Sequence, residues 1–400
     1  MNLQKKIEQN VKVPNIGEEF VCKADKCKLT CCKGWNVVLD KKTYRLYKAD
    51  DSIAKNLSKK TGNMSRRGEA FGSIKLKEDG FCSMLLDDGL CGVQARLGEH
   101  ALSKTCNTFP RLPMNYANFE VLAYTPSCPE VARLVIENEH SMKFGSAPSR
   151  GQRQIRQYNN RKGHFNERGM ALFEAFYEFF LTSKLPIWKR LVIVGSVTKA
   201  FDLDNMLTKK ELFAVIFEKQ SEMEKQSADM DPCLIQGKIF SNVLRDISKK
   251  PMHSPEWRSL LSQAGSTSKL LTEFEGAGDV VIDKYIIHRN VFYKKLNVKA
   301  EKIWTNLFLS GFLSEVEVFN QSRESILLCL YHQTLWLALI RFLFICTYNP
   351  GRNDEYDHLS YVVAVVTRAT QHGESLLLPI LQDLKAEYGD EGALTALLVA

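Results

Sequence analysis

The sequence predicts a mainly α protein in which a small, irregular, cysteine-rich metal-binding domain packs on a larger α-helical domain. Two observations predict this class. Apolar residues recur at helical spacing through the second half of the chain, and most of the cysteines gather in the first third. We expect the cysteine-rich domain over residues 1–140, a basic linker over 141–165 and the α-helical domain over 166–400.

Length and composition indicate an ordinary folded chain. The 400 residues are 44% apolar and 25% charged, and a chain of this length can form two or three domains. The first residues lack the apolar segment and the small-residue cleavage site of a signal peptide. We therefore expect a cytoplasmic protein, in which thiols stay reduced and disulfides do not form.

The helical pattern begins near Glu167. In the first helix, the apolar residues recur with the helical period: Met170, Leu172, Phe173, Phe176, Phe179 and Phe180. Similar patterns predict helices within 185–200, 208–226, 232–248, 284–314, 322–348, 357–369 and 374–398. Breaks between these segments are expected at Pro186, Pro232, Pro251, Pro255 and the turn Asn349-Pro350-Gly351.

The most apolar stretch of the chain runs from Ser325 to Ile340 and lies between Glu324 and Arg341. Its length falls below the roughly 20 apolar residues that a membrane-spanning helix needs. We therefore expect a buried helix of a helical bundle and no membrane partner.

The chain has a net charge of +8, and part of this positive charge is concentrated in one segment. The basic residues of this segment are Lys143, Arg150, Arg153, Arg156, Arg161, Lys162 and Arg168. Such a run is typical of a solvated linker, of a rim that meets an acidic protein substrate, or of a nucleic-acid arm. Aromatic residues are too sparse here to stack on bases, so a nucleic-acid partner is the least favoured interpretation.

Eight of the eleven cysteines fall in the first third of the chain: Cys22, Cys27, Cys31, Cys32, Cys82, Cys91, Cys106 and Cys128. Four thiols within eleven residues can surround one metal centre, and the spacing Cys-x4-Cys-x3-Cys-Cys is close to the plant-type ferredoxin run. Zinc sites favour shorter pairs, so zinc is the alternative metal and iron–sulfur the favoured one. The remaining cysteines, Cys233, Cys329 and Cys346, are expected to be buried free thiols.

The four ligands of one cluster are expected to be Cys22, Cys27, Cys106 and one of the adjacent pair Cys31 and Cys32. In an extended chain the side chains of this pair point apart, so the second cysteine either packs or serves a different centre. Proline lies near both Cys106 and Cys128, as in the Cys-Pro ending of bacterial ferredoxins.

Three local elements are also predicted in this part of the chain. Residues 34–39 form a short strand, and Asp40 caps the helix that follows. The pair Asp88-Gly89 forms the turn of a small hairpin that places Cys82 and Cys91 at facing ends.

The cysteine-rich part resembles the flagellin lysine N-methylase family over about residues 20–135. The resemblance rests on Cys31-Cys32-Lys33-Gly34-Trp35, Leu39-Asp40, Thr43-Tyr44, the Cys82–Cys91 segment, Leu97-Gly98, Leu102-Ser103, Thr105-Cys106, Phe109-Pro110-Arg111 and Ser127-Cys128-Pro129-Glu130-Val131. The same part resembles a broader group of small zinc- or iron-chelating proteins. The helical remainder fits the family in length and character.

The resemblance implies methyl transfer from S-adenosylmethionine to lysine side chains of flagellin, in an enzyme that holds a [4Fe-4S] cluster. Neither standard motif for the methyl donor is present. The sequence Gly276-Ala277-Gly278 lacks the third glycine of a Rossmann-like loop. The radical-enzyme motif Cys-x3-Cys-x2-Cys is also absent, because Cys27-x3-Cys31 is followed directly by Cys32. A non-catalytic iron–sulfur or zinc-binding protein, such as an electron carrier or a metal-handling factor, is the alternative function.

Candidate residues for the methyl donor lie beside the cysteine motifs. A sulfonium binds well to an aromatic face, which Trp35, Tyr44 or Phe109 offers, and Arg111 can bind a carboxylate. The alternative for each aromatic residue is simple packing around the cluster, and for Arg111 it is charge balance.

A neutral lysine amine needs desolvation or a general base, because the ordinary lysine pKa is about 10.4. The candidate bases are Asp40, Glu99, His100 and Glu130. Each is also well suited to be a helix cap or a surface residue.

Overall fold

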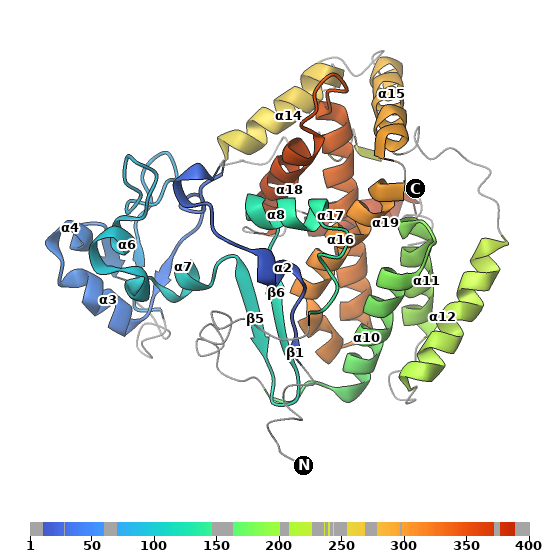
Figure 1. Cartoon of the computed structure of the whole chain (residues 1–400), viewed down its shortest axis with the longest axis horizontal. Coiled ribbons are helices and arrows are strands. Elements are labelled where there is room, and N and C mark those ends of the chain that lie inside the picture. The colour runs from blue at the N-terminus through green and yellow to red at the C-terminus, as the bar shows by residue number, and fades with distance from the viewer. Residues whose placement is uncertain are drawn as a thin grey trace.

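The computed structural model of the chain describes residues 11–27, 29–59, 70–145, 163–200, 208–225, 236, 239–240, 243, 254–268, 278–296, 298–371 and 377–388. Across these residues α-helices predominate and strands are short, which confirms the mainly α class. A small lobe of short elements forms one end of the molecule, and a bundle of long helices forms the other (Figure 1).

The small lobe contains a three-stranded antiparallel sheet. Its strands are β2 (Val38–Leu39), β4 (Gly72–Ile74) and β3 (Leu57–Lys59), in that spatial order. Short helices surround the sheet: α3 (Lys41–Lys48), α4 (Asp51–Ala54), α6 (Gly92–Leu97), η2 (Glu99–Ala101) and α7 (Lys104–Thr108).

Local sequence signals explain where elements of this lobe begin and turn. Asp40 Oδ1 accepts a hydrogen bond from Thr43 N at 2.8 Å, so the predicted cap of α3 is confirmed. The predicted turn is also present, because Gly89 has a φ of +81° and Leu86 N donates to Leu90 O. The strand expected over residues 34–39 is shorter, since only β2 forms there.

A second sheet connects the lobe to the bundle. Strands β5 (Arg111–Asn115) and β6 (Glu120–Tyr124) form an antiparallel hairpin, and β1 (Val11–Lys12) lies parallel to β6. The chain enters this hairpin directly from α7, and Figure 1 shows the hairpin beside the helices of the bundle. Helix α2 (Ile16–Glu19) and helix α8 (Pro129–Glu137) contact each other next to it.

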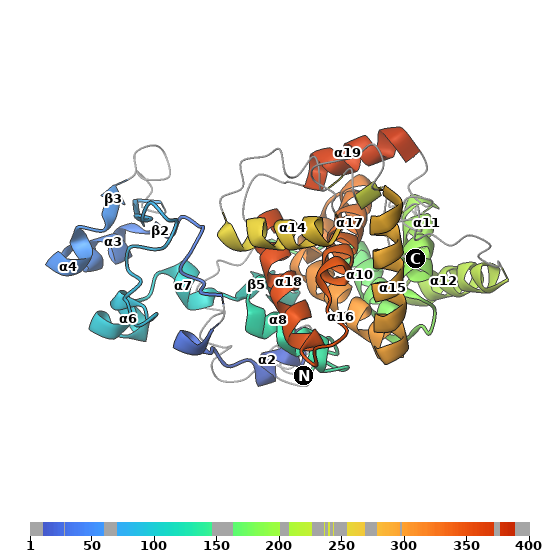
Figure 2. The same cartoon turned by 90° about the horizontal axis from the view of Figure 1, so that it is seen from above.

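The bundle contains nine long described helices, which form around one central helix. They are α10 (Glu167–Thr182), α11 (Ile187–Ala200), α12 (Lys209–Glu224), α14 (Pro255–Ser268), α15 (Gly278–Leu296), α16 (Val298–Ser314), α17 (Arg323–Thr347), α18 (Glu355–Gln371) and α19 (Leu377–Tyr388). The short helix η4 (Val316–Asn320) precedes α17. Helix α17 contacts α11, α14, α15, α16, α18 and α19, and Figure 2 shows it in the middle of the bundle.

Helix α17 is long and apolar enough to cross a membrane, with a mean hydropathy of 1.6 in its most apolar window. In the structure 83% of that window is buried inside the protein. Contacts with the surrounding helices therefore account for its apolar surface, as the sequence predicts for a bundle core.

Two hydrophobic cores are present among the described residues. The larger one joins the long helices to Ile16, Phe20 and Leu29 near the N-terminus and to β6 and α8. The smaller one lies inside the small lobe and includes Leu39, Tyr47 and Cys82. The bundle therefore includes segments from the first 140 residues, which sequence periodicity does not reveal.

Most predicted helices are found where the pattern places them. Helix α14 is an exception, because Pro255 does not break a helix as expected. It is the first residue of α14, where no N–H is needed for the helical hydrogen bonds. The range 284–314, predicted as one helical segment, contains the end of α15 and all of α16. Several predictions fall outside the described residues: most of the helix over 232–248, Cys233, the Gly276-Ala277 pair, and Arg150, Arg153, Arg156, Arg161 and Lys162 of the basic linker.

Candidate functional site

One group of cysteines lies in the core of the small lobe. Cys82 is part of this core, and Cys32, Cys91 and Cys106 pack with it. Cys82 N donates to Cys32 O at 2.8 Å. Cys82 and Cys91 are not paired across a hairpin as expected, because Cys82 pairs with Leu76 and Cys91 pairs with Leu85. Burial, together with the neighbouring thiols of Cys91, Cys31 and Cys82, raises the pKa of Cys106 to about 12.

A second group lies where the N-terminal loop meets helix α8. Cys128 immediately precedes α8 and is buried in the larger core together with Leu29. The Cys27 thiol donates a hydrogen bond to Leu29 O at 3.2 Å. Burial, together with the thiols of Cys27 and Cys22, raises the pKa of Cys128 to about 12. Cys22, Cys27 and Cys128 are therefore neighbours, although the first and the last lie 106 positions apart in the sequence.

The adjacent pair Cys31 and Cys32 lies between the two groups. Their thiols form a hydrogen bond with each other, so they do not point apart as they would in an extended chain. This hydrogen bond raises the pKa of Cys31. Cys31 also raises the pKa of Cys27 in one group and the pKa of Cys82 in the other. The expected set of Cys22, Cys27 and Cys106 is thus divided: the first two lie in one group and Cys106 in the other.

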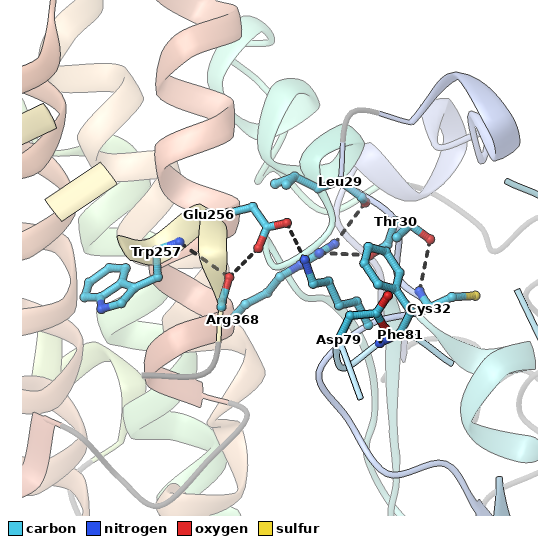
Figure 3. A network of polar contacts seen from close by, with 10 residues as sticks. Leu29, Thr30, Cys32, Asp79, Phe81, Glu256, Trp257 and Arg368 are labelled. Carbon is cyan, nitrogen blue, oxygen red and sulfur yellow. Dashed lines mark hydrogen bonds and ion pairs between the residues drawn. The ribbon is translucent and has the colours of Figure 1, made fainter. Parts of the chain in front are cut away.

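Arg368 of helix α18 joins the cysteine loop to the bundle (Figure 3). Its guanidinium donates to the backbone oxygens of Ser127 at 2.9 Å, Thr30 at 2.9 Å and Leu29 at 3.1 Å. Burial lowers the pKa of Arg368, and the thiols of Cys31, Cys128 and Cys27 act in the opposite direction. Sequence analysis did not identify Arg368, because it lies inside a regular helical pattern with no motif around it.

A second contact from the bundle reaches the same loop. Lys33 Nζ lies 2.7 Å from a Glu256 carboxylate oxygen, and its ammonium lies 4.4 Å from the centre of the Phe81 ring. Ser254 Oγ donates to the other Glu256 oxygen at 2.5 Å (Figure 3). Helices α14 and α18 therefore hold the segment around Cys27 to Lys33 at two points.

Two of the three aromatic candidates lie beside the cysteines. Trp35 donates its indole N–H to Cys31 O, and its ring contacts Phe109 edge-on at a centroid distance of 4.9 Å. Tyr44 instead packs against Phe71 at 5.2 Å on the sheet of the small lobe.

Tyr47, which sequence analysis missed, lies close to two of the lobe thiols, Cys106 and Cys91. Burial raises its pKa, and Cys106 and Cys91 raise it further. Its hydroxyl donates to Ala101 O at 2.7 Å, so it fixes η2 beside the lobe cysteines. Only the helical spacing of Tyr47 on α3 hinted that it faces inward.

Arg111 is the first residue of β5, two positions after Phe109. Its guanidinium lies 5.0 Å from the centre of the Phe20 ring. Its Nε atom is buried and has no hydrogen-bond partner among the described atoms. A buried N–H without an acceptor is costly, so this position suits an anionic ligand group such as a carboxylate.

The four candidate bases have different surroundings. Asp40 is engaged as a helix cap. Burial by itself would raise the pKa of Glu130, but its bonds with Arg133 at 2.8 Å and Lys23 at 3.4 Å lower it overall. Glu99 and His100 are exposed on η2.

The donor atoms fit a thiolate-bound metal in kind and number, since thiolates are the usual ligands of iron–sulfur clusters and of structural zinc. As positioned, no three His, Cys, Asp or Glu side chains of the described residues form an arrangement that could hold a metal ion. Metal binding would therefore have to draw the sulfurs closer together, as is usual where binding and folding are coupled.

Comparisons with known proteins agree with the sequence resemblance. Flagellar biosynthetic protein FliU of Salmonella muenchen is 34% identical over 145 residues, which are 36% of this chain and 86% of that protein. Two proteins named Lysine-N-methylase, from Salmonella typhimurium and Salmonella choleraesuis, are each 35% identical over 138 residues. That match spans 34% of this chain and about a third of the length of each methylase. No solved structure matches the chain.

The helical part carries a family match of its own. The model of the FliB lysine N-methylase C-terminal domain matches residues 174–397, which is more than half of the chain. The motifs that suggested the family lie before this range, so the two observations are independent. The chain therefore belongs to the FliB lysine N-methylase family.

Proposed function

We propose that this protein is a cytoplasmic, S-adenosylmethionine-dependent lysine N-methyltransferase that acts on flagellin and holds a [4Fe-4S] cluster in its N-terminal cysteines. Family membership carries the proposal, because the family model covers residues 174–397 and two relatives are named Lysine-N-methylase. The name of the FliU relative supports a flagellar protein as the substrate.

The methyl donor would bind beside Cys31 in this proposal. The paired rings of Trp35 and Phe109 offer an aromatic face to the sulfonium. Such a face attracts a cation that lies within about 6 Å of the ring centre. The unpaired Nε of Arg111 offers a charged hydrogen bond to the donor carboxylate. Tyr44, the remaining candidate, packs on the sheet and would support the small lobe.

The substrate lysine must lose its proton before its amine can accept a methyl group. Asp40 and Glu130 are engaged in a cap and in ion pairs, so they suit structural roles. Glu99 and His100 remain as candidate bases among the four, and an apolar surface around the lysine would lower its pKa without any base.

The residues around the cysteines would hold the cluster and moderate its charge. When bound, such a cluster supplies either a purely structural cross-link or an iron that binds the donor and exchanges electrons. Arg368 holds the loop around Cys27 and Cys31 through three backbone carbonyls and places a positive charge beside the thiolates. The cysteine loop would thus keep a fixed position on the helical bundle.

The alternative function is a non-catalytic metal-binding protein with iron–sulfur or zinc. The four cysteines in and around the small core favour this alternative for the lobe, because a group of thiols can bind metal without any reaction. A brown protein that absorbs visible light indicates iron–sulfur, whereas a colourless protein with bound zinc contradicts the cluster.

The proposed activity is tested by anaerobic incubation of the iron-loaded full chain with flagellin and S-adenosylmethionine. Intact-mass analysis should show flagellin heavier by whole methyl groups, and digestion should locate them on lysines. The variant Arg111→Gln tests the proposed contact with the donor carboxylate, and it should reduce the rate mainly by weakening binding of the methyl donor. Unmodified flagellin after incubation with folded, iron-loaded protein would refute the proposal.

A further inference from the structure

The small lobe is formed by one continuous stretch of the chain, of which residues 32–59 and 70–109 are described. The segments before and after this stretch both belong to the bundle, since Leu29 and strand β6 lie in the larger core. Figures 1 and 2 show the lobe at one end of the molecule, beside the long helices. The lobe is therefore inserted into the bundle. An inserted unit of this kind moves relative to its host unless a large apolar interface holds it.

The chain enters the lobe at Cys31. On the bundle side, Thr30 O accepts a hydrogen bond from Arg368 at 2.9 Å. On the lobe side, Cys32 O accepts from Cys82 N at 2.8 Å. Cys31 is the one residue between these two backbone anchors, so a rotation of the lobe at this crossing changes the backbone angles around Cys31.

The chain leaves the lobe between Phe109 and Pro110. Phe109 N donates to Thr105 O of helix α7 at 3.1 Å, which ties Phe109 to the lobe. Pro110 O accepts from Thr125 N at 2.9 Å, directly after β6, which ties Pro110 to the sheet of the bundle. The second crossing is therefore as narrow as the first.

The two crossings lie side by side. Trp35 donates its indole N–H to Cys31 O, and its ring contacts Phe109 edge-on at a centroid distance of 4.9 Å. A hinge commonly consists of a few residues at the ends of elements that absorb the change in backbone angles. Two adjacent single-residue crossings have this form, and together they define one axis of rotation.

Beyond the crossings, the described interface between the lobe and the bundle is small. No described helix or strand of the lobe packs extensively on one of the bundle. Lys33 Nζ lies 2.7 Å from Glu256, and the two side chains are 13% and 27% exposed, so this ion pair is partly solvated. The turn at Gly89 approaches Asp25, since a Cβ atom on Gly89 would lie 4.0 Å from Asp25 Cα. Such contacts hold a position but can be released.

We propose that the small lobe is hinged at Cys31 and Phe109, that Lys33 and Glu256 form its latch, and that the methyl donor fixes the latched position. The inference rests on the donor site of the proposed function. That site spans the hinge, because Trp35 belongs to the lobe whereas Arg111 pairs with β6 of the bundle.

A ligand shifts a conformational equilibrium only if it binds one arrangement better than the other. The donor meets this condition, because its sulfonium binds Trp35 on the lobe and its carboxylate binds Arg111 on the bundle. Methyl transfer breaks the sulfur–methyl bond, forms a nitrogen–methyl bond and leaves the electron pair on sulfur. The product is a neutral thioether, which loses the attraction of a cation to the aromatic face. The lobe is therefore held firmly before transfer and less firmly after it.

The test measures the distance between the lobe and the bundle by single-molecule fluorescence energy transfer in the iron-loaded full chain. Dyes are attached through ketone-bearing amino acids at two exposed positions, Lys48 of α3 and Arg258 of α14, so all cysteines stay intact. Lys33→Met breaks the latch from the lobe and Glu256→Gln breaks it from the bundle. Lys42→Met, on an exposed lysine of α3, is the matched control.

Without donor, both latch variants should populate a released arrangement more than the parent and Lys42→Met do. S-adenosylmethionine should return them to the latched distance at concentrations about 2- to 5-fold higher than the parent needs, the factor expected for a partly solvated ion pair. S-adenosylhomocysteine should require about 2- to 30-fold more than S-adenosylmethionine, because it lacks the sulfonium charge.

Equal distance distributions in the parent and the latch variants would overturn the proposal. So would S-adenosylmethionine that binds in calorimetry but leaves the distributions unchanged. If one latch variant does not fold, the other decides. If the parent does not bind S-adenosylmethionine at all, the donor site of the proposed function fails, and the donor-free distributions of the latch variants still decide whether the lobe is hinged.

Discussion

At the scale of single residues, Arg368 has the clearest structural consequence. It is the one described side chain that bonds to three backbone carbonyls of the cysteine-bearing segments. Hydrogen bonds that involve a charged group typically contribute about 1.5–3 kcal/mol each to stability, net of the exchange with water. Arg368 thus joins residues up to 339 positions apart in the chain.

Arg368→Ala should lower the free energy of unfolding by about 2–4 kcal/mol, because the carbonyls of Ser127 and Thr30 lose this donor and Leu29 O keeps only the Cys27 thiol. It should also reduce the iron that a folded chain retains, since the cysteine loop loses its anchor. Denaturant unfolding and iron analysis measure both effects. Arg352→Ala is the control, because Arg352 is 71% exposed and pairs only loosely with Asp354 at 3.9 Å. Equal losses in the two variants would show that Arg368 has no special role.

Glu256 provides a test by pH. Burial by itself would raise the pKa of Glu256, but bonds with Lys33 and Ser254 lower it below the ordinary carboxyl value. A carboxyl group with a lowered pKa in the folded state stabilises the protein at pH values above its unfolded pKa of about 4.3. This contribution is lost as the pH falls through the pKa of the folded state.

Glu256→Gln should therefore cost about 1 kcal/mol of unfolding free energy at neutral pH, and the difference from the parent should shrink below about pH 4. Unfolding curves at several pH values measure this. Glu324→Gln on an exposed helix end serves as the comparison and should change stability little. A cost that stays constant down to acid pH would contradict the ion pair with Lys33.

At the scale of elements, two helical glycines differ in the space that their surroundings leave for a side chain. A Cβ atom on Gly169 of α10 would lie 1.8 Å from Phe319 O, a backbone atom of η4. A Cβ atom on Gly195 of α11 would meet nothing within 4 Å. Only the first glycine is required by packing.

Gly169→Ala should destabilise the protein by about 1–3 kcal/mol, because α10 and η4 must separate. Gly195→Ala should instead stabilise it by up to about 1 kcal/mol through helix propensity. Thermal unfolding of the two variants side by side gives the comparison. A Gly169→Ala variant that is as stable as Gly195→Ala, or more stable, would show that α10 and η4 do not approach each other as described.

Helix positions were largely predictable, because the 3.6-residue period of Leu172, Phe176 and Phe180 reports burial on one face. Pro255 misled the prediction, since proline breaks a helix in its interior but starts one at its first turn. The cysteine set was identified by number and spacing alone. Its division into two groups was not predictable, because it depends on contacts such as Arg368 to Thr30, which spacing along the chain cannot reveal.

At the scale of the whole molecule, the loop around Cys27 to Lys33 leads into the small lobe and is bound to the bundle by Arg368 and Glu256. The N-terminal segment and α8 belong to the bundle core, whereas the lobe cysteines lie in a core of their own. The junction between them carries Cys31, Trp35 and Arg368, so the candidate cluster and the candidate donor site meet where the two parts join. This arrangement agrees with an enzyme in which the family-matched bundle supports the cysteine-bound centre.

The central claim is that the cysteine-bound iron centre and lysine methylation of flagellin belong to one enzyme. It is tested most directly by measuring methyl transfer to flagellin across preparations of the same chain with graded iron content, under anaerobic conditions and at saturating S-adenosylmethionine. Folding is checked in each preparation by circular dichroism. The account predicts that the rate per folded chain rises in proportion to iron content. An equal rate in folded, iron-free protein, or no transfer at full iron content, would contradict it.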